Sequence, residues 1–170
     1  MISLIIPCFN EEKNLEKLFD KLGLLLKEYS DENIEIVIVN NGSTDNSVTL
    51  IKEHELYIKK KISLLHINKN RGYGDGINRG INHSNGQIIC WFHADLQFDP
   101  IDAIKIYKNY KSNLYSQKIM IKGKRINRSL FDTFFTFGMS IFTFLFFRKK
   151  INDINAQPKM FNRSFLKLIK

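Results

Sequence analysis

The chain has 170 residues, of which 44% are hydrophobic and 25% charged, with three prolines and nine glycines. This length suits one folded domain, and the composition excludes a disordered tail, a collagen-like repeat and a disulfide scaffold. The two cysteines, Cys8 and Cys90, both lie in apolar runs. We therefore predict buried free thiols in a reducing compartment.

Charge is distributed unevenly along the chain. Residues 1–100 carry 11 Lys and Arg against 14 Asp and Glu, whereas residues 101–170 carry 15 against three. The basic C-terminal part indicates an anionic partner, and nucleic acid, anionic lipid and substrate phosphate all qualify on charge alone. The first apolar run, residues 2–6, is too short for the core of a secretory leader, so we expect the chain to begin in the cytosol.

Strands alternate with helices in the first 122 residues. Short apolar runs predict strands, and helically spaced apolar residues after polar caps predict helices. The predicted strands are 2–6, 34–39, 62–67, 88–92 and 119–121, and the predicted helices begin at Asn10, at one of Ser43, Thr44 and Asp45, within 71–80 and at Pro100. Helix-length crossovers between strands predict an α/β fold with a doubly wound, mainly parallel sheet and helices on both faces.

Ligands of open parallel sheets bind beyond the carboxyl ends of the strands. Three of the predicted strand ends carry polar clusters, at residues 7–11, 40–45 and 93–97. Each could be ordinary turn chemistry, but three at one edge of a sheet favour a binding site.

The third cluster suggests a metal. If the segment is extended, alternate side chains share a face, and His93, Asp95 and Gln97 converge. Their donors suit Mg²⁺ or Mn²⁺, and the histidine favours Mn²⁺. The alternative is that Asp95 caps the next turn while His93 packs with Trp91 and Phe92.

Residues 71–80 are rich in glycine but do not form a dinucleotide fingerprint. The G-x-G-x-x-G spacing needs a glycine at the position of Arg79, and the segment follows the third predicted strand instead of the first. We expect a tight turn into a helix whose N-terminus faces an anion.

The last 49 residues begin with a basic run, 122–128, in which four of seven residues are cationic. Guanidinium groups there suit phosphate, and the alternative is a solvated charge run. Residues 131–147 contain eight of the 14 phenylalanines. As a helix they reach roughly 26 Å, less than the ~30 Å of a hydrocarbon core. We expect a helix lying in the membrane interface; a helix buried against the sheet is the alternative. This pattern also argues against nucleic acid as partner.

Three motifs together resemble the family 2 glycosyltransferases with the GT-A fold. They lie at residues 3–12, 37–45 and 94–97. The nearest branch is similar to the polyprenyl-phosphate (dolichol-phosphate mannose synthase-like) sugar transferases, and residues 153–161 are similar to a motif of its bacterial members.

The resemblance implies an inverting, metal-dependent transfer from a UDP- or GDP-linked sugar to a polyprenyl phosphate on the cytoplasmic face of a membrane. It implies a nucleotide-sugar-binding core at 1–122 and a basic, membrane-facing acceptor segment of the same domain at 123–170. The nucleotide-sugar positions are Pro7, Phe9, Glu11, Val39, Asn41, His93, Ala94 and Asp95; the metal positions are Asp95, Gln97 and His93; the catalytic positions are Asp95, Arg125 and Arg128.

Three departures from the family pattern matter. Asn41 stands where many relatives have an aspartate for the nucleoside, and His93 replaces the first aspartate of the usual metal motif. The chain ends at Lys170 within an apparent helix that contains Phe161 and Phe165, whereas relatives usually continue, which suits a C-terminally truncated chain.

These departures keep other functions open. One is a catalytically weak or inactive module that binds nucleotide sugar or membrane. Another is a transferase that acts on a glycan acceptor and needs no lipid. A basic nucleic-acid binder would instead show steep salt dependence toward DNA or RNA.

Overall fold

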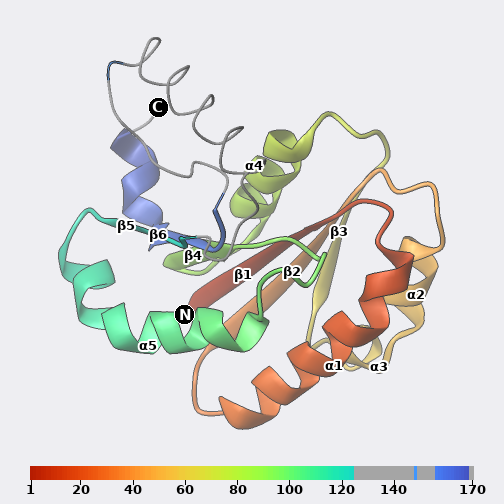
Figure 1. Ribbon diagram of the computed structural model, residues 1–170, viewed down its shortest axis with the longest axis horizontal. Helices are drawn as coiled ribbons and strands as arrows, with labels where there is room; N and C mark the ends of the chain where they lie inside the picture. The colour runs from red at the N-terminus through yellow and green to blue at the C-terminus, as the bar shows by residue number, and fades with distance from the viewer. Residues whose placement is uncertain (125–147, 149–155, 169–170) are drawn as a thin grey trace, which may run out of the picture. The chain divides into compact units, whose positions relative to one another are not determined.

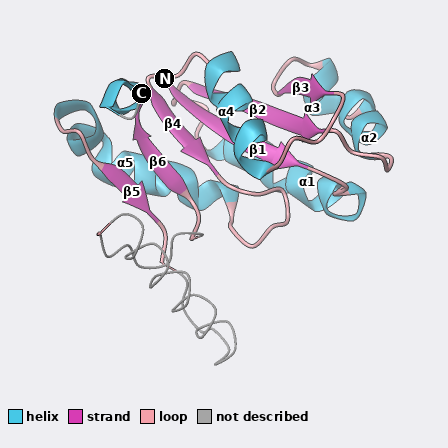
Figure 2. Ribbon diagram, turned by 90° about the horizontal axis from the view of Figure 1, so that it is seen from above, coloured by secondary structure: helices cyan, strands magenta, loops and turns pink. Residues whose placement is uncertain are grey.

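A computed structural model of the chain describes residues 1–124, 148 and 156–168. The chain divides into two compact units, one made of Met1–Ile121 with Pro158–Lys170 and the other of Lys122–Gln157. The first unit holds the sheet and its helices (Figures 1 and 2). The predicted phenylalanine-rich helix at 131–147 lies outside the described residues. Among the described helices, none combines the length and the apolar character needed to cross a membrane.

The elements alternate along the chain as the sequence pattern predicts. They are β1 (Ile2–Cys8), α1 (Glu12–Glu28), β2 (Ile34–Asn41), α2 (Ser47–Glu53), α3 (Glu55–Ile58), β3 (Ser63–Ile67), α4 (Tyr73–His83), β4 (Ile88–Trp91), α5 (Pro100–Ser116), β5 (Met120–Lys122), β6 (Lys159–Asn162) and the 3₁₀ helix η1 (Arg163–Leu168). Helix α5 begins at its proline, where the missing N–H costs nothing.

The six strands form one sheet in the order β3-β2-β1-β4-β6-β5. Strands β1 to β4 pair in parallel, and β6 pairs with β4 in the antiparallel sense. The pairing of β1 with β2 runs from Ile2 opposite Ile34 to Cys8 opposite Asn40, so their carboxyl ends are level. The predicted mainly parallel sheet is confirmed.

Helices cover both faces of the sheet. Figure 1 shows α4 on one face and α1 and α5 on the other. Alternation along β1 sends Leu4 into the core beneath α1 and α5, and Ile5 into the core beneath α4. Helix α4 lies very close to the sheet, because a Cβ at Gly80 would come within 2.5 Å of Ile5 Cγ2 and 2.8 Å of Val39 Cγ2. One glycine of the 71–80 segment is therefore required by packing.

The predicted helix at the end of the chain is wrong. Residues Lys159–Asn162 form β6, and a 3₁₀ helix follows. Because β6 pairs along β4, Met160 packs into the core on the α1 face and Phe161 into the core on the α4 face. Part of the predicted acceptor segment 123–170 thus supplies a strand of the core sheet.

The thiols of Cys8 and Cys90 are free and buried, as predicted. Burial raises the pKa of Cys8 to about 12, and the nearby charge of Glu11 adds to this effect. Burial alone raises the pKa of Cys90. Both thiols are therefore protonated and chemically inert near neutral pH.

Candidate functional site

The ends of β1 and β2 are joined by hydrogen bonds between residues 9–12 and 43–47, which we call the β1–β2 corner. The backbone N–H of Asn10 donates to Ser43 Oγ at 3.0 Å, and the backbone N–H of Thr44 donates to Asn10 Oδ1 at 2.8 Å. The N–H of Glu11 donates to the buried hydroxyl of Ser47, also at 3.0 Å. These bonds fix one loop against the other.

Two carboxylates complete this corner. Asp45 Oδ2 accepts the N–H of Glu12 at 3.1 Å, and Glu12 Oε2 accepts the N–H of Asn46 at 3.0 Å. Burial works against ionisation of Asp45, but hydrogen bonds from Ser47 and Glu12 outweigh it and lower the pKa of this carboxyl. Asp45 therefore stays an anion and an acceptor at neutral pH.

The predicted helix caps at this corner are wrong in detail. Helix α1 is preceded by Glu11 without a capping side-chain bond, and Asn10 has a φ of 56°. Helix α2 is preceded by Asn46, also without one, although Asp45 Oδ1 accepts the N–H of Ser47 at 3.0 Å. The polar side chains instead cross-link two strands, which is a long-range contact that local sequence does not specify.

The residues expected to bind nucleotide at β1 and β2 differ in exposure. Pro7 is buried in β1, and Val39, its register partner, is fully buried. Phe9 is 42% exposed, so its side chain is accessible at the surface. Glu11 is half-buried, with Oε2 accepting the amide of Asn14 at 2.6 Å.

Asn41, at the end of β2, is held by the loop between β3 and α4. Its Nδ2 donates to the carbonyl oxygen of Gly72 at 3.0 Å and to Asn70 Oδ1 at 3.3 Å. These two acceptors orient the amide, and Oδ1 is buried without a hydrogen-bond partner among the described residues. A Cβ at Gly76 would lie 3.2 Å from Asn41 Cγ, so α4 packs directly on this side chain. A buried acceptor with no donor is costly, and an N–H of a ligand would satisfy it.

The loop after β4 meets β1 through its backbone. The N–H of Ala94 donates to the carbonyl oxygen of Pro7 at 3.3 Å. The predicted extended geometry is wrong here, because Ala94 and Asp95 lie in a turn and Leu96 has a φ of 61°. Asp95 Oδ1 accepts the N–H of Gln97 at 3.1 Å, as the turn alternative foresaw.

His93 packs differently from both predictions. Its ring stacks on Tyr73, the first residue of α4, with centroids 4.6 Å apart and an interplanar angle of 14°. Burial and then the charge of Asp95 raise the pKa of Tyr73 to about 12. We call residues 72–76 with 93–97 the α4–β4 corner. The sequence analysis missed Tyr73, and its only signal was an aromatic residue within a glycine-rich segment.

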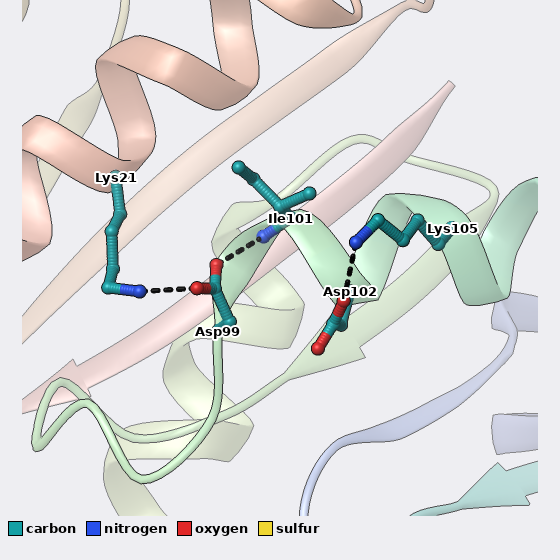
Figure 3. Close-up of polar contacts among 5 residues, drawn as sticks. All are labelled: Lys21, Asp99, Ile101, Asp102 and Lys105. Carbon is teal, nitrogen blue, oxygen red and sulfur yellow. Dashed lines mark hydrogen bonds and ion pairs between the residues drawn. The ribbon is translucent and has the colours of Figure 1, made fainter.

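The loop after β4 is also tied to α1. Lys21 of α1 forms an ion pair with Asp99, whose Oδ1 accepts the N–H of Ile101 at 3.1 Å (Figure 3). In the first turn of α5, Asp102 forms an ion pair with Lys105 at 3.0 Å, and Figure 3 also draws this pair. Asp99 thus caps α5 and anchors the segment that carries Asp95.

The predicted metal positions His93, Asp95 and Gln97 all lie in the loop after β4. Within residues 1–124, 148 and 156–168, no three His, Cys, Asp or Glu side chains come together as a metal site would require. Gln97 is exposed, and its backbone N–H bonds Asp95. The predicted catalytic residues Arg125 and Arg128 lie outside the described residues.

Comparison with known proteins gives the family. The profile described as "Glycosyl transferase family 2" matches residues 3–168. A dolichyl-phosphate β-glucosyltransferase of Trichomonas vaginalis is 29% identical over 182 residues, covering 99% of this chain and 55% of that protein. A dolichol-phosphate mannosyltransferase of Pyrococcus furiosus is 34% identical over 110 residues, covering 61% of this chain and 30% of that protein. The chain spans about half or less of the length of the curated relatives it matches.

Solved structures share the fold. A mannosyltransferase from Pyrobaculum calidifontis, solved with GDP-Man and Mn²⁺, has a TM-score of 0.67 at 18% identity, covering 99% of this chain and 46% of that one. Glucosyl-3-phosphoglycerate synthase from Mycobacterium tuberculosis, solved with Mn²⁺, UDP-glucose and phosphoglyceric acid, has a TM-score of 0.66 at 17% identity, covering 96% and 57%. The predicted GT-A-like α/β fold is confirmed. By its sequence match over nearly its whole length, the chain belongs to glycosyltransferase family 2.

Proposed function

We propose that this chain is an inverting glycosyltransferase that moves a sugar from a nucleotide diphosphate sugar to a polyprenyl phosphate. The observation that carries the proposal is the meeting of three loops at the carboxyl edge of β1, β2 and β4. They bring an exposed ring, Phe9, a buried unpaired amide oxygen, Asn41 Oδ1, and a carboxylate, Asp95, to one edge of one sheet. The ring could stack on the base, and the amide oxygen could accept an N–H of the base. The carboxylate could hold a cation that is bound to the diphosphate.

The nucleoside would bind between Asn41 at the end of β2 and Phe9 at the β1–β2 corner. Asn41 presents an acceptor, because its donor group is engaged by Gly72 and Asn70. Uracil and guanine both carry a ring N–H that can donate to it, so either UDP or GDP suits this contact. The ring of Phe9 offers a stacking surface, and aromatic stacking contributes about 1–3 kcal/mol per base in single-strand binding.

The diphosphate would bind at the α4–β4 corner. Asp95 would hold Mg²⁺ or Mn²⁺ there together with phosphate oxygens, with His93 as a further ligand. Bound in this way, the cation would neutralise charge on the leaving diphosphate. The Mn²⁺ of the two solved relatives supports this role for a divalent cation.

The reaction balances without a protein base. An oxygen of the acceptor phosphate forms a bond to the anomeric carbon as the bond from that carbon to the diphosphate oxygen breaks, and the configuration inverts. The acceptor is a phosphate monoester, which is mostly the dianion at neutral pH, and the attacking oxygen of the dianion carries no proton. Arg125 and Arg128 would orient it, since orientation supplies much of the rate gain in such transfers. The lipid acceptors named for the relatives support this choice, as does the basic C-terminal part.

The chemistry of the acceptor implies a location. A polyprenyl phosphate stays in the membrane, so the enzyme would work at its cytoplasmic face as a peripheral protein. The basic run at 122–128 and the phenylalanine-rich segment at 131–147 would contact headgroups and the interface.

A transfer assay tests the proposal. The full chain would be incubated with a radiolabelled UDP- or GDP-sugar, Mn²⁺ and vesicles that contain polyprenyl phosphate. We expect label in the lipid phase only when polyprenyl phosphate and the cation are both present. Transfer to a soluble glycan in the absence of lipid would show that the acceptor is a glycan and not a polyprenyl phosphate. Nucleotide binding without any transfer would support an inactive binding module.

A further inference from the structure

The side chain of Asn40 is fully buried near the end of β2, and both ends of its amide have a partner. Oδ1 accepts the backbone N–H of Ser43 at 3.2 Å, and Nδ2 lies 3.0 Å from Nδ1 of His66. A backbone N–H can only donate, so the bond from Ser43 identifies the amide oxygen and leaves Nδ2 as the donor toward His66. Nδ1 of His66 is therefore the acceptor, and the proton of the neutral imidazole lies on Nε2.

His66 belongs to β3, the strand at one edge of the sheet (Figure 2). It is the register partner of Asn40, and its own side chain is exposed. The acceptor of the Asn40 amide therefore comes from the neighbouring strand and not from the loop that Asn40 helps to fold. A buried donor without an acceptor is costly, so Nδ1 of His66 fixes which way this amide points.

The amide of Asn40 reaches the β1–β2 corner through Ser43. Ser43 Oγ accepts the N–H of Asn10 at 3.0 Å, and Asn10 Oδ1 accepts the N–H of Thr44 at 2.8 Å. Asn10 has a φ of 56°, a left-handed conformation that is uncommon outside glycine, and it directly follows Phe9. Because Asn10 itself donates to Ser43, this bond stabilises the backbone that carries Phe9.

We propose that His66 is a positioning residue of the donor site, which acts through Asn40 to hold the β1–β2 corner ready for a nucleoside. The inference rests on the proposed function, in which the nucleoside binds between Asn41 and Phe9. Without an acceptor on His66, the Asn40 amide would satisfy its donor only by turning away from Ser43. The corner would then have to be ordered again when a nucleotide binds, and such ordering lowers affinity.

The test measures nucleotide affinity and the exchange of one amide proton. UDP and GDP would be titrated into the full chain with Mn²⁺ by isothermal calorimetry, and hydrogen exchange of the Ser43 N–H would be followed by NMR. His66→Phe keeps a planar ring but lacks the acceptor. We expect it to weaken affinity about 2- to 13-fold, the range of one net hydrogen bond, and to speed exchange at Ser43. His66→Asn places an amide oxygen at the position of Nδ1 and should keep both values near those of the wild type.

Matched variants separate positioning from a purely structural role. His66→Leu also lacks an acceptor and serves if the phenylalanine variant is unstable, and His83→Leu replaces an exposed histidine at the end of α4 as the control. A purely structural role would lower the unfolding free energy but leave the nucleotide affinity of the folded chain unchanged. That result in His66→Phe and His66→Leu, or an equal loss of affinity in His66→Asn, would overturn this inference and leave the proposed function standing. A wild-type chain that binds neither nucleotide would overturn both.

Discussion

The β1–β2 corner is joined by hydrogen bonds that run in both directions between its loops, whereas the α4–β4 corner contains the stacked rings of Tyr73 and His93. Several hydrogen bonds fix the distances and directions between many atoms of the two loops. A pair of stacked rings fixes only the orientation of one ring plane relative to the other. The first corner is therefore formed before any ligand binds, and the second carries Asp95, the carboxylate proposed to meet a cation. We expect substitutions in the first to lower stability and those in the second to change ligand binding.

The largest effect is expected at the α4–β4 corner. Asp95→Asn removes the carboxylate that would hold the cation, and we expect sugar transfer to fall by about 100- to 1000-fold, the scale seen when one group that stabilises developing charge is lost. The unfolding free energy should change little. Initial rates of transfer and urea unfolding would both be measured.

The control for Asp95→Asn is Asp102→Asn, which neutralises an exposed carboxylate paired with Lys105. It should leave the transfer rate unchanged. Equal losses in the two variants would show that net charge, not the position of Asp95, governs the rate.

The next largest effect is expected on stability, at the C-terminal end of α4, which Arg163 contacts. The Arg163 guanidinium donates to the carbonyl oxygens of Gly86, Ile81 and Ser84 at 2.8–2.9 Å. Arg163→Ala should lower the unfolding free energy by about 2–4 kcal/mol, because several carbonyls lose a charged donor. Urea unfolding measures it.

Arg79→Ala is the matched control, since Arg79 forms an exposed ion pair with Asp75 within α4. It should cost less than about 0.5 kcal/mol. If the two variants lose equal stability, the contacts of Arg163 are not what holds α4 to the end of the sheet.

A smaller effect is expected at the β1–β2 corner. Ser47 is fully buried, and its hydroxyl accepts the N–H of Glu11. Ser47→Ala should lower the unfolding free energy by about 1–2 kcal/mol, because the N–H is left without its acceptor. Ser116→Ala, which removes an exposed hydroxyl on α5, is the control and should be neutral. A neutral Ser47→Ala would contradict the idea that hydrogen bonds preform this corner.

At the amino end of β2, we expect Glu35 to make the stability of the fold depend on pH. Burial opposes ionisation of Glu35, but hydrogen bonds from Ser3, Asn85 and Gly86 lower its pKa. The folded pKa lies below the unfolded one, so this group stabilises the fold above its ordinary pKa of about 4.3, and the contribution is lost as pH falls through the lowered value. Glu35→Gln should cost about 1 kcal/mol at pH 7 after allowance for partial exposure.

The measurement for Glu35→Gln is the urea midpoint at several pH values between 7 and 3. The gap between wild type and variant should narrow as the pH falls. A gap that stays constant across this range would mean that the carboxylate charge contributes nothing.

The smallest effect is expected at the tie between α1 and the loop after β4. Lys21 and Asp99 are each 36% exposed, and exposed pairs contribute about 0–1 kcal/mol (Figure 3). Lys21→Met should lower stability by no more than this amount and reduce nucleotide affinity less than twofold. A tenfold loss of affinity would show that this ion pair positions Asp95.

Much of the fold followed from local pattern. The periods of apolar residues located β1 to β4 and the helices between them, and alternation of strand and helix implied a parallel sheet. The strand β6 could not be predicted, since Phe161 and Phe165 are four apart and suit a helix equally well. Its conformation is decided by the free edge of β4, which lies some 70 positions earlier in the chain.

The sequence predicted where the site lies, but not how its side chains contact one another. The carboxyl ends of parallel strands had to share an edge, which brought residues 7–11, 40–45 and 93–97 together. The stack of Tyr73 on His93 joins residues from two elements, and no spacing rule connects them. The turn at Asp95 likewise depends on a positive φ at Leu96, a conformation uncommon for leucine.

The most direct test of the central claim is the melting temperature of the purified chain with UDP or GDP, each with Mn²⁺ and with EDTA. A ligand at 100 times its dissociation constant adds about 2.7 kcal/mol, which raises the midpoint of a domain of this size by roughly 5–10 °C. We predict such a rise with at least one diphosphate and its loss in EDTA. An unchanged midpoint with both nucleotides in Mn²⁺ would contradict a nucleotide-sugar site at this edge of the sheet.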